Sequence, residues 1–139
     1  MGHVPPEPVR GVGEGGHLQG RERRGAPEGR VARGAAGEDL AAAWYRRHGY
    51  QVLDRNWRVR AGELDVVARR GRTLVVCEVK ARRTEAFGSP LDAVTPAKQA
   101  RLRRLAALYL AASSLRVGTV RFDVAAVLDG RIEVVEAAF

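Results

Sequence analysis

Residues 62–82 contain two apolar runs joined at Gly71, and this pair constrains the fold more than any other part of the chain. The first run, at 63–69, alternates as a strand does. The second, at 73–81, is apolar on both faces except at two charged positions. A strand with two apolar faces is covered on both sides, as at the centre of a sheet. The sequence therefore predicts a hairpin whose second strand is central.

A helix and a strand precede this hairpin. Apolar residues at helical spacing predict a helix over residues 35–48, with Gly49 as its left-handed stop. His48 then lies in the last turn, where a cation is favourable. The alternating residues 50–59 predict one more strand.

A second helix and two further strands follow the hairpin. Thr95 is placed as the N-cap of the helix, directly before a proline. Its buried face is predicted to consist of Leu102, Leu105, Ala106 and Tyr109. Strands at 119–128 and 131–136 meet at an Asp129-Gly130 turn. The predicted fold is α/β, in the order α-β-β-β-α-β-β.

The first part of the chain differs in composition from the rest. Residues 1–34 are rich in Gly, Pro and Arg and contain almost no large apolar side chains, so they are predicted to form a disordered tail. The folded domain is assigned to residues 35–139. Gly11, Gly13 and Gly16 match a dinucleotide-binding fingerprint, but no strand precedes them and no helix follows, so we interpret them as linker composition.

The charge of the chain indicates a polyanionic partner. Its formal net charge is +8, and it has only two lysines, Lys80 and Lys98, so arginine supplies nearly all of the positive charge. Arginine binds phosphate bidentately, and basic domains attract nucleic acid through counterion release. A genome that favours Arg, Ala and Gly codons would produce part of the same excess.

Cysteine usage and hydropathy bear on the cellular location. Cys77 is the single cysteine, so it has no partner within the chain for a disulfide or a zinc cage, which fits a reducing compartment. No stretch has the apolar length of a signal peptide or a membrane span. We therefore expect a cytoplasmic protein without a membrane partner.

Four charged residues interrupt the apolar hairpin. Side chains two apart on a strand share a face, so Glu63 lies beside Asp65, and Glu78 lies beside Lys80. If the strands are neighbours, all four converge, and the acids outnumber the lysine. An unpaired carboxylate in a core costs several kcal/mol or takes up a proton, so a divalent cation would complete the charge balance.

The donor types select the cation. Carboxylates without nearby His or Cys form an all-oxygen site that suits Mg²⁺ or Mn²⁺. Such a site serves phosphodiester hydrolysis, with a lysine that orients the nucleophile or stabilises developing charge. Each residue also has a structural interpretation: Glu78 and Lys80 would form an ion pair at a strand end, and Asp65 would serve a turn. Their joint occurrence on consecutive strands favours the metal site.

These residues carry a family resemblance. An aspartate on one strand and Glu-x-Lys on the next, framed by helices, resemble the PD-(D/E)XK nuclease superfamily with its restriction-endonuclease-like fold. The motifs "GEDLAAAWYRRHGYQVLDRNWR", "GELDVVA", "VVCEVKAR" and "FGSPLDAVTPAKQARL" resemble the uncharacterised bacterial YraN-like family, which is itself similar to archaeal Holliday junction resolvases. The likeness covers residues 34–136. It implies a mixed sheet flanked by helices.

The resemblance also implies roles for individual residues. Asp65, Glu78 and Lys80 match the catalytic trio of the superfamily, and Glu38 matches an acid on the first helix that many members use. Leu64 replaces the proline that names the motif. By the same likeness, Mg²⁺ or Mn²⁺ would be held by the two strand acids and the backbone carbonyl of the residue between Glu78 and Lys80, which is Val79.

Two further residues are assigned supporting roles. Glu63 belongs to the "GE-x-D" pattern of the narrower family, and Gln99 corresponds weakly to a helix residue that steadies the site in some relatives. Trp44 and Trp57 could stack on bases, but both sit in apolar patterns and are better explained as core residues.

Basic residues surround the end of the third strand and the second helix. They are predicted to contact a nucleic-acid backbone without reading bases. The set is Arg82, Arg83, Lys98, Arg101, Arg103 and Arg104. Each one taken singly is also explained as a solvated surface residue.

The sequence thus favours a metal-dependent endonuclease that acts on DNA, such as branched or recombination intermediates. The alternative is a non-catalytic nucleic-acid-binding or adaptor module that retains the fold. Resolvase-like relatives act as dimers because a junction has two symmetric cuts, so the resemblance also suggests a homodimer. No sequence pattern marks a dimer surface.

Overall fold

The structure is a computed structural model, and it describes residues 28–82 and 94–139. Its elements are α2 (Glu28–Arg47), β1 (Gln51–Val59), β2 (Gly62–Arg70), β3 (Thr73–Arg82), α3 (Pro96–Ala111), β4 (Thr119–Leu128) and β5 (Arg131–Val135). The predicted order of helices and strands is therefore confirmed.

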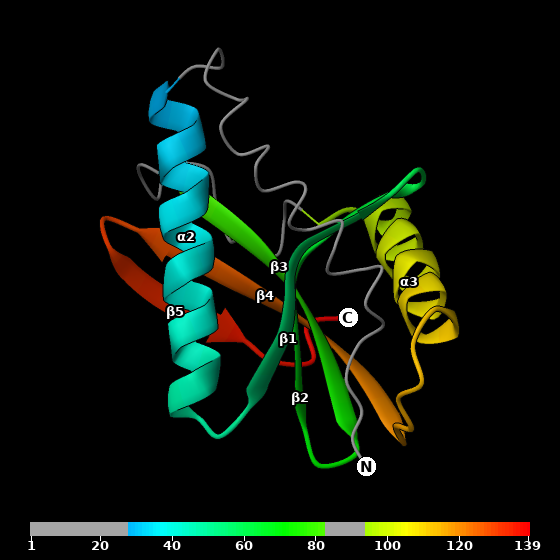
Figure 1. The fold of residues 1–139 in the computed structure, drawn as a ribbon. Helices are drawn as coiled ribbons and strands as arrows, with labels where there is room; N and C mark the ends of the chain where they lie inside the picture. Colours follow the sequence, from blue (N-terminus) through cyan, green and yellow to red (C-terminus); the bar gives the residue numbers. More distant parts are fainter. Residues whose placement is uncertain (1–27, 83–93) are drawn as a thin grey trace.

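The strands form one five-stranded sheet in the order β1-β2-β3-β4-β5, with a helix against each face (Figure 1). Strands β3 and β4 pair in parallel, and the other neighbours pair antiparallel. A parallel pair needs a long crossover connection, and α3 lies within it. The prediction of a mixed α/β fold with a central third strand is confirmed.

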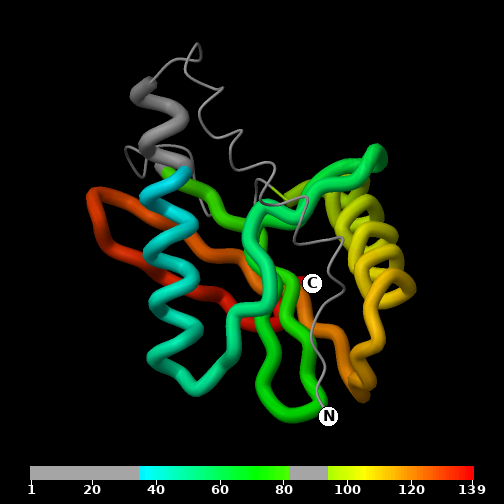
Figure 2. Tube along the Cα trace, in the orientation of Figure 1, coloured from blue at the N-terminus to red at the C-terminus, as the bar shows by residue number. Residues whose placement is uncertain are grey.

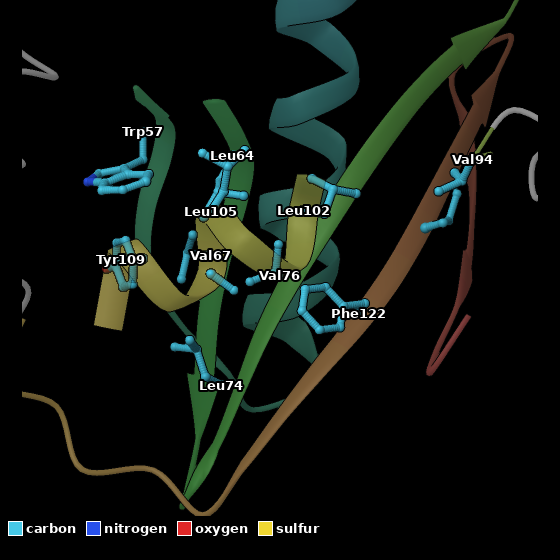
Figure 3. Close-up of a cluster of buried hydrophobic side chains, with 12 residues drawn as sticks. Trp57, Leu64, Val67, Leu74, Val76, Val94, Leu102, Leu105, Tyr109 and Phe122 are labelled. Carbon is cyan, nitrogen blue, oxygen red and sulfur yellow. The ribbon is translucent and has the colours of Figure 1, made fainter. Parts of the chain in front are cut away.

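The face of the sheet covered by α3 carries the larger apolar cluster (Figure 3). The helix contributes the four residues that the sequence predicted for its buried side. They pack on Trp57, Leu64, Leu74, Val76 and Phe122, among others. Trp57 is 3% exposed, so its assignment to the core is confirmed.

The face covered by α2 carries a second cluster. Tyr45 of the helix is fully buried against Val75 and Cys77 of β3 and Ala125 of β4. Trp44 is partly buried at the edge of this cluster, and its ring stacks on His48 with the centroids 3.8 Å apart. Helix α2 therefore packs the side that carries Tyr45 against the sheet.

The helix ends follow the predicted signals. Gly49 has φ 87°, and the Tyr50 N–H donates to the carbonyl of Tyr45 over 2.9 Å, which closes the end of α2. At the start of α3, Oγ1 of Thr95 accepts from the Lys98 N–H over 3.2 Å. Asp129, at φ 51°, and the glycine after it form the predicted turn.

The start of α2 differs from the prediction. The helix begins at Glu28 rather than at residue 35, so it includes the end of the predicted tail. Once a helix has nucleated, each added residue gains a backbone hydrogen bond, so a helix can extend beyond the apolar pattern that predicts it. The rest of the tail, residues 1–27, lies outside the described residues. Within the described ranges, neither helix is long and apolar enough to cross a membrane.

Candidate functional site

The candidate site lies where the pairing of β2 with β3 ends. The ladder runs from Arg70↔Thr73 to Val66↔Cys77 and records no pair beyond. Asp65 precedes Val66 in β2 and so lies just beyond the last pair, and its Oδ2 accepts from the Val79 N–H over 2.9 Å. A side chain thus takes the place of a backbone carbonyl in the ladder. This bond holds the carboxylate against β3 beside Glu78.

A break in the alternation of β2 accompanies this bond. Leu64 and Val67 both lie in the cluster under α3, although they are three residues apart. Val66 lies in the cluster under α2. Regular alternation would put Leu64 and Val67 on opposite faces, so the strand is irregular around Asp65. The argument from shared strand faces therefore does not hold strictly at this residue.

Burial and nearby acids raise the pKa of Asp65. This pKa is about 8; burial makes the largest contribution to the increase and the Glu78 carboxylate the next largest. The hydrogen bond from Val79 acts in the opposite direction, and the charges of Glu38 and Glu63 add to the increase. The four predicted acids thus lie close enough to affect one titration.

Glu78 is neutralised by a lysine of α3. Nζ of Lys98 lies 2.8 Å from Oε2 of Glu78, and the two side chains are 31% and 9% exposed. Lys98 was predicted to contact nucleic acid, and the structure places it at the acidic site instead of on the open helix surface. Lys80, the lysine of the strand motif, is partly buried, and the described residues record no ion pair for it. Its catalytic assignment stays a prediction.

The two remaining acids have partners of their own. Glu38 of α2 accepts from Nδ2 of Asn56 over 2.8 Å, and Asn56 sits at φ 53° in β1. Burial raises the pKa of Glu38, while Asn56 and Arg55 lower it. Glu63 accepts from Nε of Arg58 over 2.9 Å. Sequence patterns did not indicate Asn56, because nothing in its own strand marks a contact with a helix.

The oxygen donors of the site match the predicted cation. Within residues 28–82 and 94–139, no three His, Cys, Asp or Glu side chains lie close enough to form a metal cluster. Asp65, Glu78 and the carbonyl of Val79 are all oxygen donors, however, and Mg²⁺ is commonly held by one or two carboxylates, with water and substrate phosphates completing the shell. The negative charge of Glu78, which adds to burial in raising the pKa of Asp65, also favours a cation there. These residues therefore fit Mg²⁺ or Mn²⁺.

The basic surroundings are divided between α3 and the β1–β2 hairpin. Arg101, Arg103 and Arg104 are exposed on α3. The hairpin reaches the first turns of this helix (Figure 2), and a Cβ at Gly62 would lie 3.7 Å from Cδ of Arg101. The hairpin adds two exposed arginines that the sequence patterns did not indicate. They are Arg58 and Arg60.

The sequence patterns assigned four more residues to the site or to its basic surroundings. Gln99 donates from Nε2 to the carbonyl of Val94 over 3.1 Å, so it supports the start of α3 rather than an acid of the site. Arg103 has its guanidinium carbon 5.4 Å from the ring centroid of Phe122. Arg82 is the last residue of β3, and its side chain and all of Arg83 lie outside the described part of the chain.

Comparison with known proteins gives one family. The sequence model of an uncharacterised protein family, UPF0102, matches residues 37–127, a range that contains all the acids of the site and Lys98. A UPF0102 protein of Acidothermus cellulolyticus is 51% identical, and the match covers 83% of this chain and 98% of that protein. UPF0102 proteins of Beutenbergia cavernae and Geobacter sulfurreducens are 54% and 49% identical, with 70% and 68% of this chain and 83% and 73% of the relatives covered.

Proposed function

The chain belongs to the uncharacterised protein family UPF0102, and from its acidic site we propose that it is a metal-dependent nuclease that hydrolyses phosphodiester bonds in DNA. The family is the one that the YraN-like motifs indicated. One observation carries the proposal: Asp65 accepts a hydrogen bond from the backbone of β3 beside Glu78, and the negative charge of Glu78 adds to burial in raising the pKa of Asp65. A divalent cation would offset that charge.

The likeness to the PD-(D/E)XK superfamily supports the proposal. The order of elements agrees with a nuclease-like core, and Asp65, Glu78 and Lys80 lie on neighbouring strands of the sheet. Fold alone does not determine activity, so the proposal depends on the acids and the lysine. The likeness to archaeal Holliday junction resolvases extends the proposal to branched DNA.

Each residue has a role in the proposed reaction. Asp65, Glu78 and the Val79 carbonyl would hold the cation. When bound, such an ion polarises a phosphoryl oxygen and makes water a better nucleophile. The Lys80 ammonium would donate to the nucleophile or to the charge that develops on the phosphate. Glu38, from α2, would orient the attacking water or take part in holding a second ion.

The arginines would position the substrate. Phosphate contacts fix a nucleic-acid backbone without reading its sequence. Arg101 and Arg104 on α3, with Arg58 and Arg60 on the adjacent hairpin, supply such contacts beside the acids. This arrangement favours recognition of backbone geometry over base sequence.

The direct test is cleavage. Purified protein is incubated with end-labelled duplex, flap and four-way DNA in Mg²⁺ or Mn²⁺, with EDTA as the blank. We expect cleavage of at least one substrate, and Lys80→Met should slow it by about 10²–10⁴-fold, as expected for the loss of a positioned proton donor. Asp65→Asn, which keeps an oxygen to accept from Val79, should reduce it at least as strongly.

Asp39→Asn is the matched control, because Asp39 is the exposed neighbour of Glu38 and pairs with Arg55 outside the acidic cluster. It should cleave as the wild type does. Cleavage by Asp65→Asn at the wild-type rate, or no cleavage of any substrate, would reject the nuclease proposal.

The alternative function is a non-catalytic nucleic-acid-binding or adaptor module. It is favoured by the pairing of the acids with protein groups: Glu78 with Lys98, Glu63 with Arg58 and Glu38 with Asn56. A thermal shift in Mn²⁺ separates the two functions. A metal-induced rise in Tm that disappears in Glu78→Ala favours the nuclease, whereas DNA binding that ignores metal favours the module.

A further inference from the structure

The ion pair between Lys98 and Glu78 places a protein cation on a predicted metal ligand. The Nζ–Oε2 distance of 2.8 Å is that of a direct charge-assisted hydrogen bond. Glu78 is almost completely buried, so in the absence of a metal its charge needs a partner. Lys98 supplies that partner from a different element of the fold.

The backbone of Lys98 is fixed while its side chain has room to move. Its N–H donates to the N-cap Thr95, and the next residue, Gln99, donates from its backbone to the Thr95 carbonyl over 2.8 Å. The ammonium sits at the end of a flexible four-carbon stem that is 31% exposed. The head group can therefore leave Glu78 without any change in α3.

An ammonium and a divalent ion that bind the same carboxylate compete. Any group that stabilises the metal-free state lowers the apparent affinity for the metal, and metal binding in turn releases the group. The released ammonium stays within the reach of its stem, beside the residues that would hold the ion. A phosphate of the substrate would bring the complementary charge to that place.

We propose that Lys98 is an exchangeable counter-ion, which neutralises Glu78 in the metal-free protein and transfers to a phosphate oxygen of the nucleic acid when a divalent cation binds. This inference rests on the proposed metal site. It assigns Lys98 to the coupling between metal and phosphate binding, a role distinct from that of the exposed arginines of α3.

The first experiment measures Mn²⁺ binding by isothermal titration calorimetry, which needs no cleavage. Lys98→Met removes the charge and keeps much of the stem, so Mn²⁺ should bind about fivefold more tightly, a factor that corresponds to about 1 kcal/mol. Lys98→Arg retains the cation and should stay near the wild type. Arg104→Met removes the same charge from an exposed position of α3 and should also leave Mn²⁺ affinity near that of the wild type.

The second experiment measures affinity for a labelled DNA duplex by fluorescence anisotropy. It is performed once in EDTA and once in Ca²⁺, which also takes oxygen ligands. The loss caused by Lys98→Met should be severalfold in Ca²⁺ and slight in EDTA, because the ammonium is held by Glu78 until the metal arrives. Arg104→Met should weaken binding equally in both.

The outcomes separate the two proposals. Mn²⁺ affinity that is unchanged or weaker in Lys98→Met, or an equal loss of DNA affinity with and without Ca²⁺, overturns the counter-ion role while leaving the metal site intact. If Mn²⁺ binds neither the wild type nor Lys98→Met, the metal site itself is rejected.

Discussion

Two acids lie close to the central strand β3, and they differ in their hydrogen-bond partners. Asp123 of β4 is fully buried opposite Cys77, and it accepts hydrogen bonds from the Tyr45 hydroxyl, the backbone N–H of Ala137 and two nitrogens of Arg121. Asp65 of β2 has one recorded donor in the described part of the chain, the Val79 N–H. The first acid is neutralised in place, and the second is not.

This difference indicates which acid serves the fold and which serves a site. The Arg121 guanidinium forms an ion pair with Asp123 at 2.9 Å, and the hydrogen bond to Asp123 is the main factor that raises the pKa of this arginine. Asp65 instead is buried near Glu78, and burial and the Glu78 charge both raise its pKa. An acid with a complete set of partners has no capacity for a ligand, whereas an acid with excess charge gains from one.

The largest expected effect is on the neutralised acid. Asp123→Ala leaves Arg121 and Tyr45 without their buried acceptor, so the free energy of unfolding should fall by about 3–5 kcal/mol, as is typical when one partner of a buried ion pair is removed. Urea denaturation measures this change. Asp39→Ala, which breaks an exposed ion pair with Arg55, should cost about 0.5 kcal/mol. Equal costs for the two variants would show that Asp123 is not a structural anchor.

A smaller and pH-dependent effect is expected at Asp65. Its folded-state pKa of about 8 lies above the ordinary 3.8, so the folded protein binds this proton more tightly than the unfolded chain does. Its stabilising contribution is complete at low pH and is lost as the pH rises toward the folded-state pKa. Asp65→Asn has no such proton to lose.

Relative to the wild type in EDTA, Asp65→Asn should therefore gain on the order of 3–4 kcal/mol in unfolding free energy between about pH 5 and about pH 8. Denaturation curves at the two pH values give the difference, and Asp39→Asn is the control that should show no such trend. A wild-type-minus-variant difference that does not depend on pH would contradict the raised pKa of Asp65.

The smallest effect concerns the cations. Arg121 is tied to Asp123, whereas Arg104 is exposed on α3. Arg104→Ala should leave stability within about 0.5 kcal/mol of the wild type, as for most surface substitutions. If Arg104 contacts a phosphate, the slope of log K for DNA binding against log salt should become less steep by about 0.9. An unchanged slope would remove Arg104 from the proposed interface.

Local signals in the sequence were sufficient for much of the fold. Gly49, Thr95 and the Asp129-Gly130 pair each meet a requirement of their own few residues, such as a left-handed backbone or a cap, and each was found where predicted. The apolar run of β3 likewise predicts a strand that is buried on both faces. These features depend on residues close by in the sequence, so sequence patterns can predict them.

The partners of the acids were not readable in this way. Tyr45 and Asp123 are 78 positions apart, and no pattern within either element indicates the other. The pairing of Glu78 with Lys98 depends on where α3 crosses the sheet, which packing decides. The pairing of adjacent strands therefore predicted that Asp65 and Glu78 lie close together, whereas Lys98 was predicted to be a surface residue that contacts nucleic acid.

The bond between the Asp65 carboxylate and the Val79 amide makes one side chain a rung of the sheet. A ligand or proton that draws electron density from that carboxylate would weaken this hydrogen bond, so occupancy of the site would change the protection of the Val79 amide. Exchange of the Val79 amide proton with solvent therefore reports the state of the Asp65 carboxylate.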